Sequence, residues 1–206
     1  ANRRVKFISV RFEAVVGEIL ENVENSQMGV ILKRMMLRAA EKIAANYDIS
    51  ALVTGEAIAQ VSSQTLTNLN IIDAVTERLV LRPLITSDKE DIIKIARQIG
   101  TEEFAANMPE YCGVISVKPT TRAKMHKVEA EEANFDFAVL DAAIENAQHL
   151  NIDELANLDT SKVDVESFAA PIPNSSIIDI RHPDEQARKP LKVAGQEIIN
   201  MPFYSL

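Results

Sequence analysis

Short apolar runs alternate along this chain with longer stretches in which apolar residues recur at helical spacing. Residues 5–10 and 51–53 are compact apolar runs and predict strands, and Val80-Leu81, which meets a proline, predicts the last strand of a sheet. The spacing of apolar side chains predicts helices over 13–23 and 28–46. Strands that alternate with helices in this way indicate an α/β fold with a doubly wound parallel sheet.

Further helices are predicted in the second half of the chain. One runs from a capping box, Ser87 with Glu90, to Gly100 at its C-cap. Others are predicted over 121–134 and from Asp136 onward, and a short one over 151–158.

The helical periodicity fades after residue 158. Prolines and small polar residues over 159–176 predict a linker, and the apolar run that begins at Ile177 predicts a further strand. The chain therefore divides into three parts, 1–158, 159–176 and 177–206.

The loop after the strand at 51–53 carries most of the candidate chemistry. Gly55 stands where that strand ends, and ligands of open α/β sheets bind at the carboxyl ends of strands. The following residues, 60–68, are rich in amide and hydroxyl groups and carry no charge, which favours recognition of a base edge or a sugar over proton transfer. The alternative is an ordinary polar connection between a strand and a helix.

Two single residues, Lys89 and Cys112, each allow two interpretations. Lys89 falls in the first turn of its helix, where the helix dipole favours anions. Its acidic neighbours neutralise it, or it points at a phosphate or a leaving group. Cys112 is the single cysteine, in a proline-containing loop, and is either a small buried apolar residue or an exposed thiol available for reaction.

Charge and composition limit the function classes. The formal net charge is −8, so contact with nucleic acid would require a local basic patch. Arg122, Lys124 and Lys127 form such a basic run, which is either a solvated helix face or a contact for an RNA backbone. His126 has no other metal-ligand types beside it, so no metal site is predicted.

A single cysteine excludes an intrachain disulfide and fits a reducing cytoplasm. No apolar run reaches the roughly 18 residues that a membrane helix needs, and no signal peptide is recognisable. We therefore expect a soluble, cytoplasmic protein that has no membrane partner.

Three long stretches carry a resemblance to a known family. TGEAIAQVSSQTLTNL at 54–69, MGVILKRMMLRAAEKIA from Met28, and MPEYCGVIS at 108–116 resemble bacterial tRNA 4-thiouridine synthetases, also called tRNA sulfurtransferases, the ThiI family. The resemblance implies the distal part of a PP-loop ATP pyrophosphatase domain with a helical extension. IIDIRHPDE at 177–185 resembles the first strand of a rhodanese-like domain, and IINMP at 198–202 resembles its second strand. That domain would be incomplete here.

The resemblance implies an enzyme that uses ATP, with Mg²⁺, to adenylate a tRNA uridine and then replaces its O4 with persulfide sulfur. By the same resemblance, Lys33, Gly55 and Gln64 bind ATP, whereas Cys112 and Lys89 are catalytic. Cys112 would form a disulfide with the persulfide-bearing cysteine of the rhodanese-like domain. The implied partners are tRNA, a cysteine desulfurase as sulfur donor and, in a homodimer, a second copy of the chain. The resemblance also implies a supply of sulfur for synthesis of the thiamine thiazole.

Parts of the family pattern have no counterpart in this sequence. The Ser-Gly-Gly segment that binds pyrophosphate, the N-terminal RNA-binding region and the rhodanese active-site loop are missing, so we expect a fragment that is inactive alone. Two alternatives stay open. One is an interaction or dimerisation module without catalysis, and the other is part of a different PP-loop ATP pyrophosphatase that acts on a small molecule.

Overall fold

The computed structural model describes residues 5–108, 116, 118–155, 176–181, 183–193 and 195–201. It divides into two compact units, residues 1–155 and 156–206, which are treated separately below.

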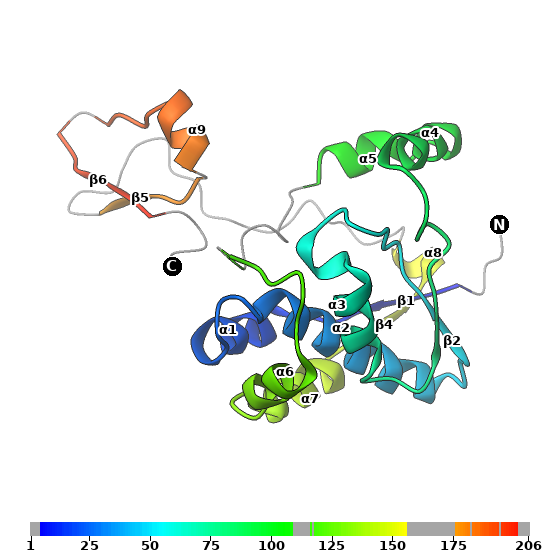
Figure 1. The fold of residues 1–206 in the computed structure, drawn as a ribbon. Helices are drawn as coiled ribbons and strands as arrows, with labels where there is room; N and C mark the ends of the chain where they lie inside the picture. Colours follow the sequence, from blue (N-terminus) through cyan, green and yellow to red (C-terminus); the bar gives the residue numbers. More distant parts are fainter. Residues whose placement is uncertain are drawn as a thin grey trace. The chain divides into compact units, whose positions relative to one another are not determined.

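Helix α2 (Met28–Asn46) is the centre of the first unit (Figure 1). It contacts α1 (Glu13–Asn22), α3 (Leu66–Asp73), α6 (Met125–Glu132) and α7 (Phe137–Glu145). Ile31 and Met35 of α2 are fully buried and recur at helical spacing, as the sequence predicts. The core that surrounds them comprises Val15, Ile19, Val23, Met28, Val30, Leu37, Ala39, Ile71, Ile72, Ala123, Val128, Phe135 and Leu140.

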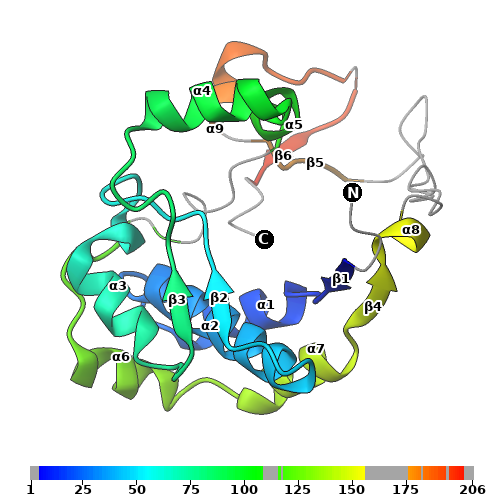
Figure 2. The same cartoon turned by 90° about the vertical axis from the view of Figure 1, so that its right-hand side faces the viewer.

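The described strands of this unit form two pairs (Figure 2). β2 (Ala51–Val53) and β3 (Leu79–Leu81) are parallel, with Leu52 opposite Val80, and Leu52 packs against the core. β1 (Lys6–Ser9) instead pairs antiparallel with β4 (Gln148–Asn151). The α/β class and the parallel β2–β3 pair agree with the sequence analysis, which predicted no strand at 148–151.

The residues around Lys89 differ from the predicted capping box. α4 (Lys89–Ile99) has Asp88 as its N-cap, because the Asp88 carboxylate accepts a hydrogen bond from the Lys89 backbone N–H at 3.1 Å. The prediction of Ser87 as N-cap is therefore wrong. Gly100 is the C-cap, as predicted, with a left-handed φ of 75° that favours glycine.

Short elements complete the first unit. They are the 3₁₀ turn η1 (Ser62–Gln64), α5 (Glu102–Ala106) and α8 (Ile152–Leu155). Asp136 caps α7 as predicted, accepting a hydrogen bond from the Ala138 N–H at 2.9 Å.

The second unit contains β5 (Ile177–Asp179), α9 (Pro183–Arg188) and β6 (Ile198–Asn200). β5 and β6 pair in parallel, with Ile178 opposite Ile199. The buried Asp179 carboxylate forms an ion pair with the Arg181 guanidinium at 2.6 Å. The two strands predicted after the linker are thus confirmed as strands.

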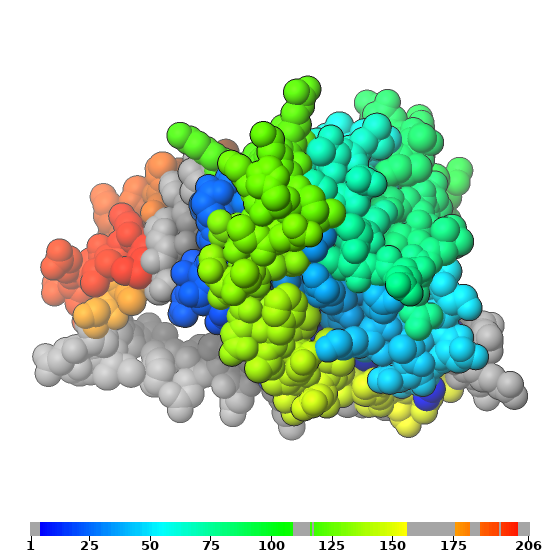
Figure 3. Space-filling view, turned by 60° about the horizontal axis from the view of Figure 1, so that its bottom comes forward, coloured from blue at the N-terminus to red at the C-terminus, as the bar shows by residue number. Residues whose placement is uncertain are grey.

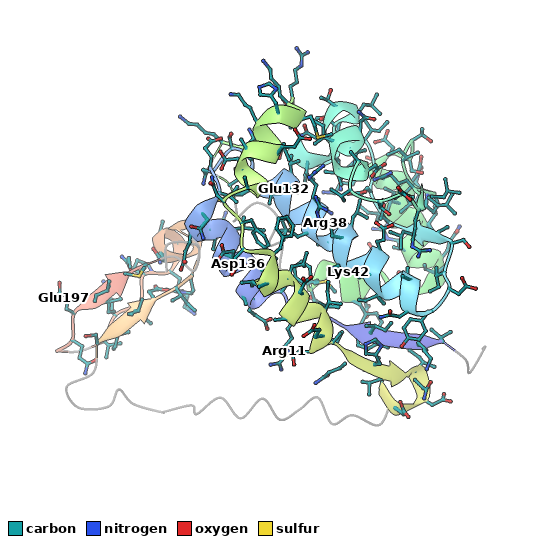
Figure 4. The ribbon with its side chains drawn as sticks, turned by 90° about the horizontal axis from the view of Figure 1, so that it is seen from below. Arg11, Arg38, Lys42, Glu132, Asp136 and Glu197 are labelled. Atoms are coloured by element: carbon teal, nitrogen blue, oxygen red, sulfur yellow. The ribbon has the colours of Figure 1, made fainter. Side chains whose placement is uncertain are left out.

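A buried ion pair joins α2 to α6 in the first unit. Arg34 donates from two nitrogens to the two carboxylate oxygens of Glu132, at 2.7 and 2.8 Å, and also to the carbonyl of Ile71 on α3. Arg38 adds a second cation at 3.1 Å, and Figure 4 shows Arg38 and Glu132 facing each other between their helices. Burial would raise the pKa of Glu132, but Arg34 and Arg38 together hold that pKa below its ordinary value of 4.5. The pair therefore remains charged at neutral pH.

Replacing Glu132 by Gln is expected to lower the free energy of unfolding by about 3 kcal/mol, because Arg34 would remain buried without a counter-ion. Urea unfolding followed by circular dichroism measures the loss. Asp141→Asn is the matched control: it removes an exposed partner of Lys42 and should cost less than about 1 kcal/mol. Equal losses in the two variants would show that Glu132 contributes no more than a surface pair.

Candidate functional site

The loop that follows β2 is held by backbone hydrogen bonds to the segment that follows β3. The Thr54 N–H donates to the Leu81 carbonyl and the Ile58 N–H to the Ile85 carbonyl, both at 3.0 Å. Farther along, the Ala59 N–H donates to the Gln64 carbonyl at 3.1 Å and closes the loop on itself. The carboxyl end of the parallel pair is therefore an ordered platform, the position where ligands of α/β sheets bind.

Glu56, directly after Gly55, is the buried charge of this platform. Its side chain is 7% exposed and accepts a hydrogen bond from Arg82 Nε at 2.8 Å. Lys33 Nζ, reaching across from α2, lies 3.5 Å from the other carboxylate oxygen. Burial would raise the pKa of Glu56, but hydrogen bonding from Arg82 and the charge of Lys33 more than offset it, so the pKa lies below 4.5. Glu56 is thus a fixed anion that holds the Lys33 ammonium beside the loop.

Arg82 connects this anion to α3. Its two terminal nitrogens donate hydrogen bonds to the two carboxylate oxygens of Asp73, at 2.8 and 2.6 Å, and its Nε donates to Glu56. A guanidinium has the planar geometry for two such contacts at once. Lys33 is therefore the outermost member of a chain of charges that runs from α3 through Arg82 and Glu56 to α2.

A small pocket opens beside Lys33. It is lined by Gly29 and Lys33 of α2, by residues 61–63 of the loop, and by Ser116 and Pro119 from a distant part of the chain. The fully buried Asn68 joins these parts, because its amide nitrogen donates at 2.8 Å to the carbonyls of both Ser62 and Thr120. A cation and several hydroxyl groups thus surround one hollow.

Two features of the loop fit a nucleotide. The Oε1 atom of Gln64 is buried and has no hydrogen-bond partner among the described residues, so a ligand could supply the missing donor. Gly55 is exposed, and a side chain built on it would meet nothing within 4 Å, so its backbone faces open space. The amide of Gln64 and the ammonium of Lys33 suit a base or ribose and a phosphate respectively.

The structure brings together some of the predicted site residues and not others. Lys33 and the Gly55-Glu56 turn are linked by the ion pair, and residues 61–63, next to Gln64, share the pocket with Lys33. Lys89 is exposed at the start of α4, and none of the described contacts joins it to these residues. Cys112 lies outside the described residues, but Ser116, four positions later, lines the pocket.

Sequence reasoning missed three residues that shape this site: Glu56, Arg82 and Asn68. A lone acid next to the ligand-facing glycine, and an arginine that ends the adjacent strand, were the available signals. Asn68 had no such signal, because its partners are 6 and 52 positions away. No group of three or more His, Cys, Asp or Glu side chains suited to a metal occurs within the described part of the chain.

Comparison with known proteins places this arrangement in a family. The family model described as Thiamine biosynthesis protein (ThiI) matches residues 1–137. The chain belongs to the ThiI family. The tRNA sulfurtransferase of Salmonella newport (strain SL254) is 57% identical over 207 residues, and that of Escherichia coli O139:H28 (strain E24377A / ETEC) is 56% identical.

Each of these two family members is aligned over 100% of this chain but only 43% of its own length, so the chain spans less than half of the relatives it matches. A crystal structure of a 4-thiouridine synthetase in complex with RNA and with bound ATP is also similar. It is 30% identical, with a TM-score of 0.65, over 70% of this chain and 39% of that one. In the parts of this chain that the structure describes, no helix is long and apolar enough to cross a membrane.

Arg82→Met is expected to lower the free energy of unfolding at pH 7 by about 3 kcal/mol, because Glu56 would lose its closest cation and keep only the Thr54 hydroxyl and the longer contact to Lys33. Lys33→Met leaves Arg82 against Glu56 and should cost less than about 1 kcal/mol. Thermal or urea unfolding of the two variants measures the difference, and a Lys33 variant as unstable as the Arg82 variant would contradict the proposed order of the charges.

The same network predicts a pH dependence. Because the pKa of Glu56 is lower in the folded chain than its ordinary 4.5, its contribution to stability is complete above about pH 4.5 and is lost as the pH falls through the folded value. Unfolding measured between pH 3 and pH 7 should therefore show a smaller acid loss in Glu56→Gln than in the unaltered chain. If Glu56→Gln lost as much stability in acid as the unaltered chain, protonation of Glu56 would not contribute to the acid loss.

Proposed function

We propose that this chain is part of an ATP-dependent tRNA sulfurtransferase that converts a tRNA uridine to 4-thiouridine. Three observations support the proposal. Lys33 is paired with Glu56, directly after the open backbone of Gly55. Gln64, whose buried Oε1 has no partner among the described residues, directly follows Ser62 and Ser63, which line the pocket beside Lys33. The family membership and the ATP bound in the related 4-thiouridine synthetase support the same reading.

In the proposed reaction the uridine O4 attacks the α-phosphorus of ATP and pyrophosphate leaves. Persulfide sulfur then forms the new bond at C4, and AMP leaves with the former O4. This chemistry depends on positioning and on stabilising charge at phosphorus. Lys33 provides a positive charge that Glu56 holds in place, Gly55 allows close approach to its backbone, and Gln64 binds the base or ribose.

The remaining roles concern the sulfur. Cys112 is proposed to act as a thiolate that attacks the inner sulfur of the persulfide-bearing cysteine. The bond between the inner and the outer sulfur then breaks, the outer sulfur stays on C4, and a disulfide joins the two cysteines. Each cycle therefore needs a reductant that reopens this disulfide. Ser116, four positions after Cys112 in the sequence, lines the pocket beside Lys33, and this supports the proposed role. Lys89 is proposed to act on a phosphate or leaving group.

The finer organisation is part of the proposal. Residues 1–158 would be the distal part of a PP-loop ATP pyrophosphatase domain with a doubly wound sheet, 159–176 a linker and 177–206 the start of a rhodanese-like domain. Mg²⁺ would accompany the ATP phosphates. The partners would be tRNA, a cysteine desulfurase and, in a homodimer, a second copy. The enzyme would work in the cytoplasm and also supply sulfur for thiamine thiazole synthesis.

Calorimetric titration of this chain with ATP tests the site. Weak binding that depends on the adenine base is expected. Gln64→Ala and Lys33→Met should each weaken it about tenfold or more, because each removes one polar contact. Lys42→Met, which alters an exposed lysine of the same helix, is the control and should bind as the unaltered chain does. Absence of ATP binding, together with a concentration-dependent dimer in sedimentation, would favour an interaction module instead.

Lys89→Ala in the full-length enzyme is expected to lower turnover without lowering stability, because Lys89 is exposed and has no ion pair within the described structure. Single-turnover formation of 4-thiouridine and thermal unfolding provide the two readouts. Lys94→Ala, which alters another exposed lysine of α4, is the control. Normal turnover of the Lys89 variant would reject its catalytic role.

A further inference from the structure

A group of cations gathers in one stretch of this acidic chain. Residues 118–127, here called the basic segment, contain Lys118, Arg122, Lys124 and Lys127 and no Asp or Glu, whereas the whole chain has a formal net charge of −8. A local excess of one charge sign, opposite to the net charge, indicates a surface for a partner of opposite charge.

The four cations are exposed, and none forms an ion pair within 4 Å in the described structure. Lys127 interacts with Glu24 only through its charge. The pKa of Glu24 is lowered chiefly by the Ser26 hydroxyl and to a lesser degree by Lys127. By contrast Lys42, Lys94 and Arg97, which are also exposed, each pair with a carboxylate. The bright-green surface in Figure 3 and the nitrogen-tipped side chains on α6 in Figure 4 project away from the body of the first unit.

The backbone of the basic segment is firmly held although its side chains are free to reach outward. The Thr120 N–H donates to the Ser26 carbonyl at 2.9 Å, and the Ala123 N–H donates to the buried Oδ1 of Asn68 at 2.9 Å. Val128, just beyond the segment, is fully buried in the core. Cations on an ordered backbone lose less conformational entropy on binding than cations on a mobile tail.

The basic segment begins at the wall of the candidate site. Pro119 lines the same pocket as Lys33 and Ser62, and Asn68 joins the carbonyls of Ser62 and Thr120. The cations therefore continue from the rim of the pocket along α6. If one nucleotide of a polyanion lay at the pocket, the cations of the basic segment would lie beside the neighbouring phosphates.

We propose that the basic segment binds phosphates of the RNA substrate and holds its reacting nucleotide at the pocket. This inference rests on the proposed function. RNA fits better than a membrane surface, because the larger apolar residues of α6 pack on the core. Val128 is buried and Met125 is partly buried against that core, which leaves the small Ala130 as the exposed apolar residue of the helix. The contacts are to the backbone, so they would position the RNA and make its binding depend on salt without reading its sequence.

The test uses this chain and an unmodified tRNA transcript, with fluorescence anisotropy at several salt concentrations. In the variant, Lys118, Arg122, Lys124 and Lys127 are all changed to Gln. Each lost phosphate contact should make the plot of log K against log salt shallower by about 0.7 to 0.9. The variant is therefore expected to bind tRNA at least tenfold more weakly at low salt, with a slope smaller by roughly 3.

The control variant removes the same total charge elsewhere, by changing Arg11, Lys42, Lys94 and Arg97 to Gln. It should keep most of the affinity and the salt slope, and circular dichroism should show that both variants are folded. Equal weakening in the two variants, unaltered binding in the first, or no salt-dependent binding by the original chain would overturn the proposal.

Two further measurements show whether the basic segment binds the phosphates of RNA, of ATP or of a membrane. ATP titration of the basic-segment variant should match that of the original chain, and a joint loss of ATP and tRNA binding would assign the cations to ATP and overturn the inference. Binding to phosphatidylserine vesicles that exceeds tRNA binding, and is lost in the variant, would assign them to a membrane. Failure of ATP binding in the original chain counts against the proposed function alone.

Discussion

Two buried carboxylates, Glu56 and Glu132, stay ionised because cations surround each, and neighbouring residues of α2 contact both. Arg82 is the main partner of Glu56. Lys33 reaches Glu56 on the loop after β2, and Arg34 binds Glu132 on α6 through both oxygens. Removing a carboxylate from water raises its pKa unless opposite charges and hydrogen bonds compensate. Successive positions on a helix point about 100° apart, so one turn of α2 serves both the candidate site and the packing of the helices. The geometry of the site therefore follows from the placement of α2 in the core.

The second connection between site and core is the amide of Asn68. It binds the carbonyls of Ser62 and Thr120 and accepts from the Ala123 N–H, so one buried side chain ties the ligand loop to the start of the basic segment. A buried amide with every group satisfied is rigid, because any movement leaves a polar atom without a partner. The pocket wall and the cations beside it consequently share one fixed frame, which is what a site for a nucleotide within a longer polyanion requires.

The sequence predicted elements well where a local pattern decides them and poorly where distant partners do. The helix at 28–46 and the strand at 51–53 follow from apolar spacing and flanking turn residues, and their observed bounds agree. At the start of α4 two adjacent residues, Ser87 and Asp88, could each cap, and the backbone geometry selected the second. β4 is a mostly polar strand that exists because β1 pairs with it. The paired residues, from Ser9 with Gln148 to Lys6 with Asn151, are far apart in the sequence, so the pairing leaves no local pattern.

By itself the sequence determined the α/β class, the helices α1, α2, α6 and α7, the family resemblance and the residues Lys33, Gly55 and Gln64 as candidates for binding ATP. These follow from local spacing and from long matching stretches, both of which can be read along the chain. Only the tertiary structure decided that Glu56 holds Lys33, that Arg82 holds Glu56, and that the basic segment begins at the pocket. Those relations join residues that are far apart in the sequence, such as Lys33 with Glu56 and Asn68 with Thr120. They form only when folding buries these groups, because a buried charge or polar group without a partner costs free energy.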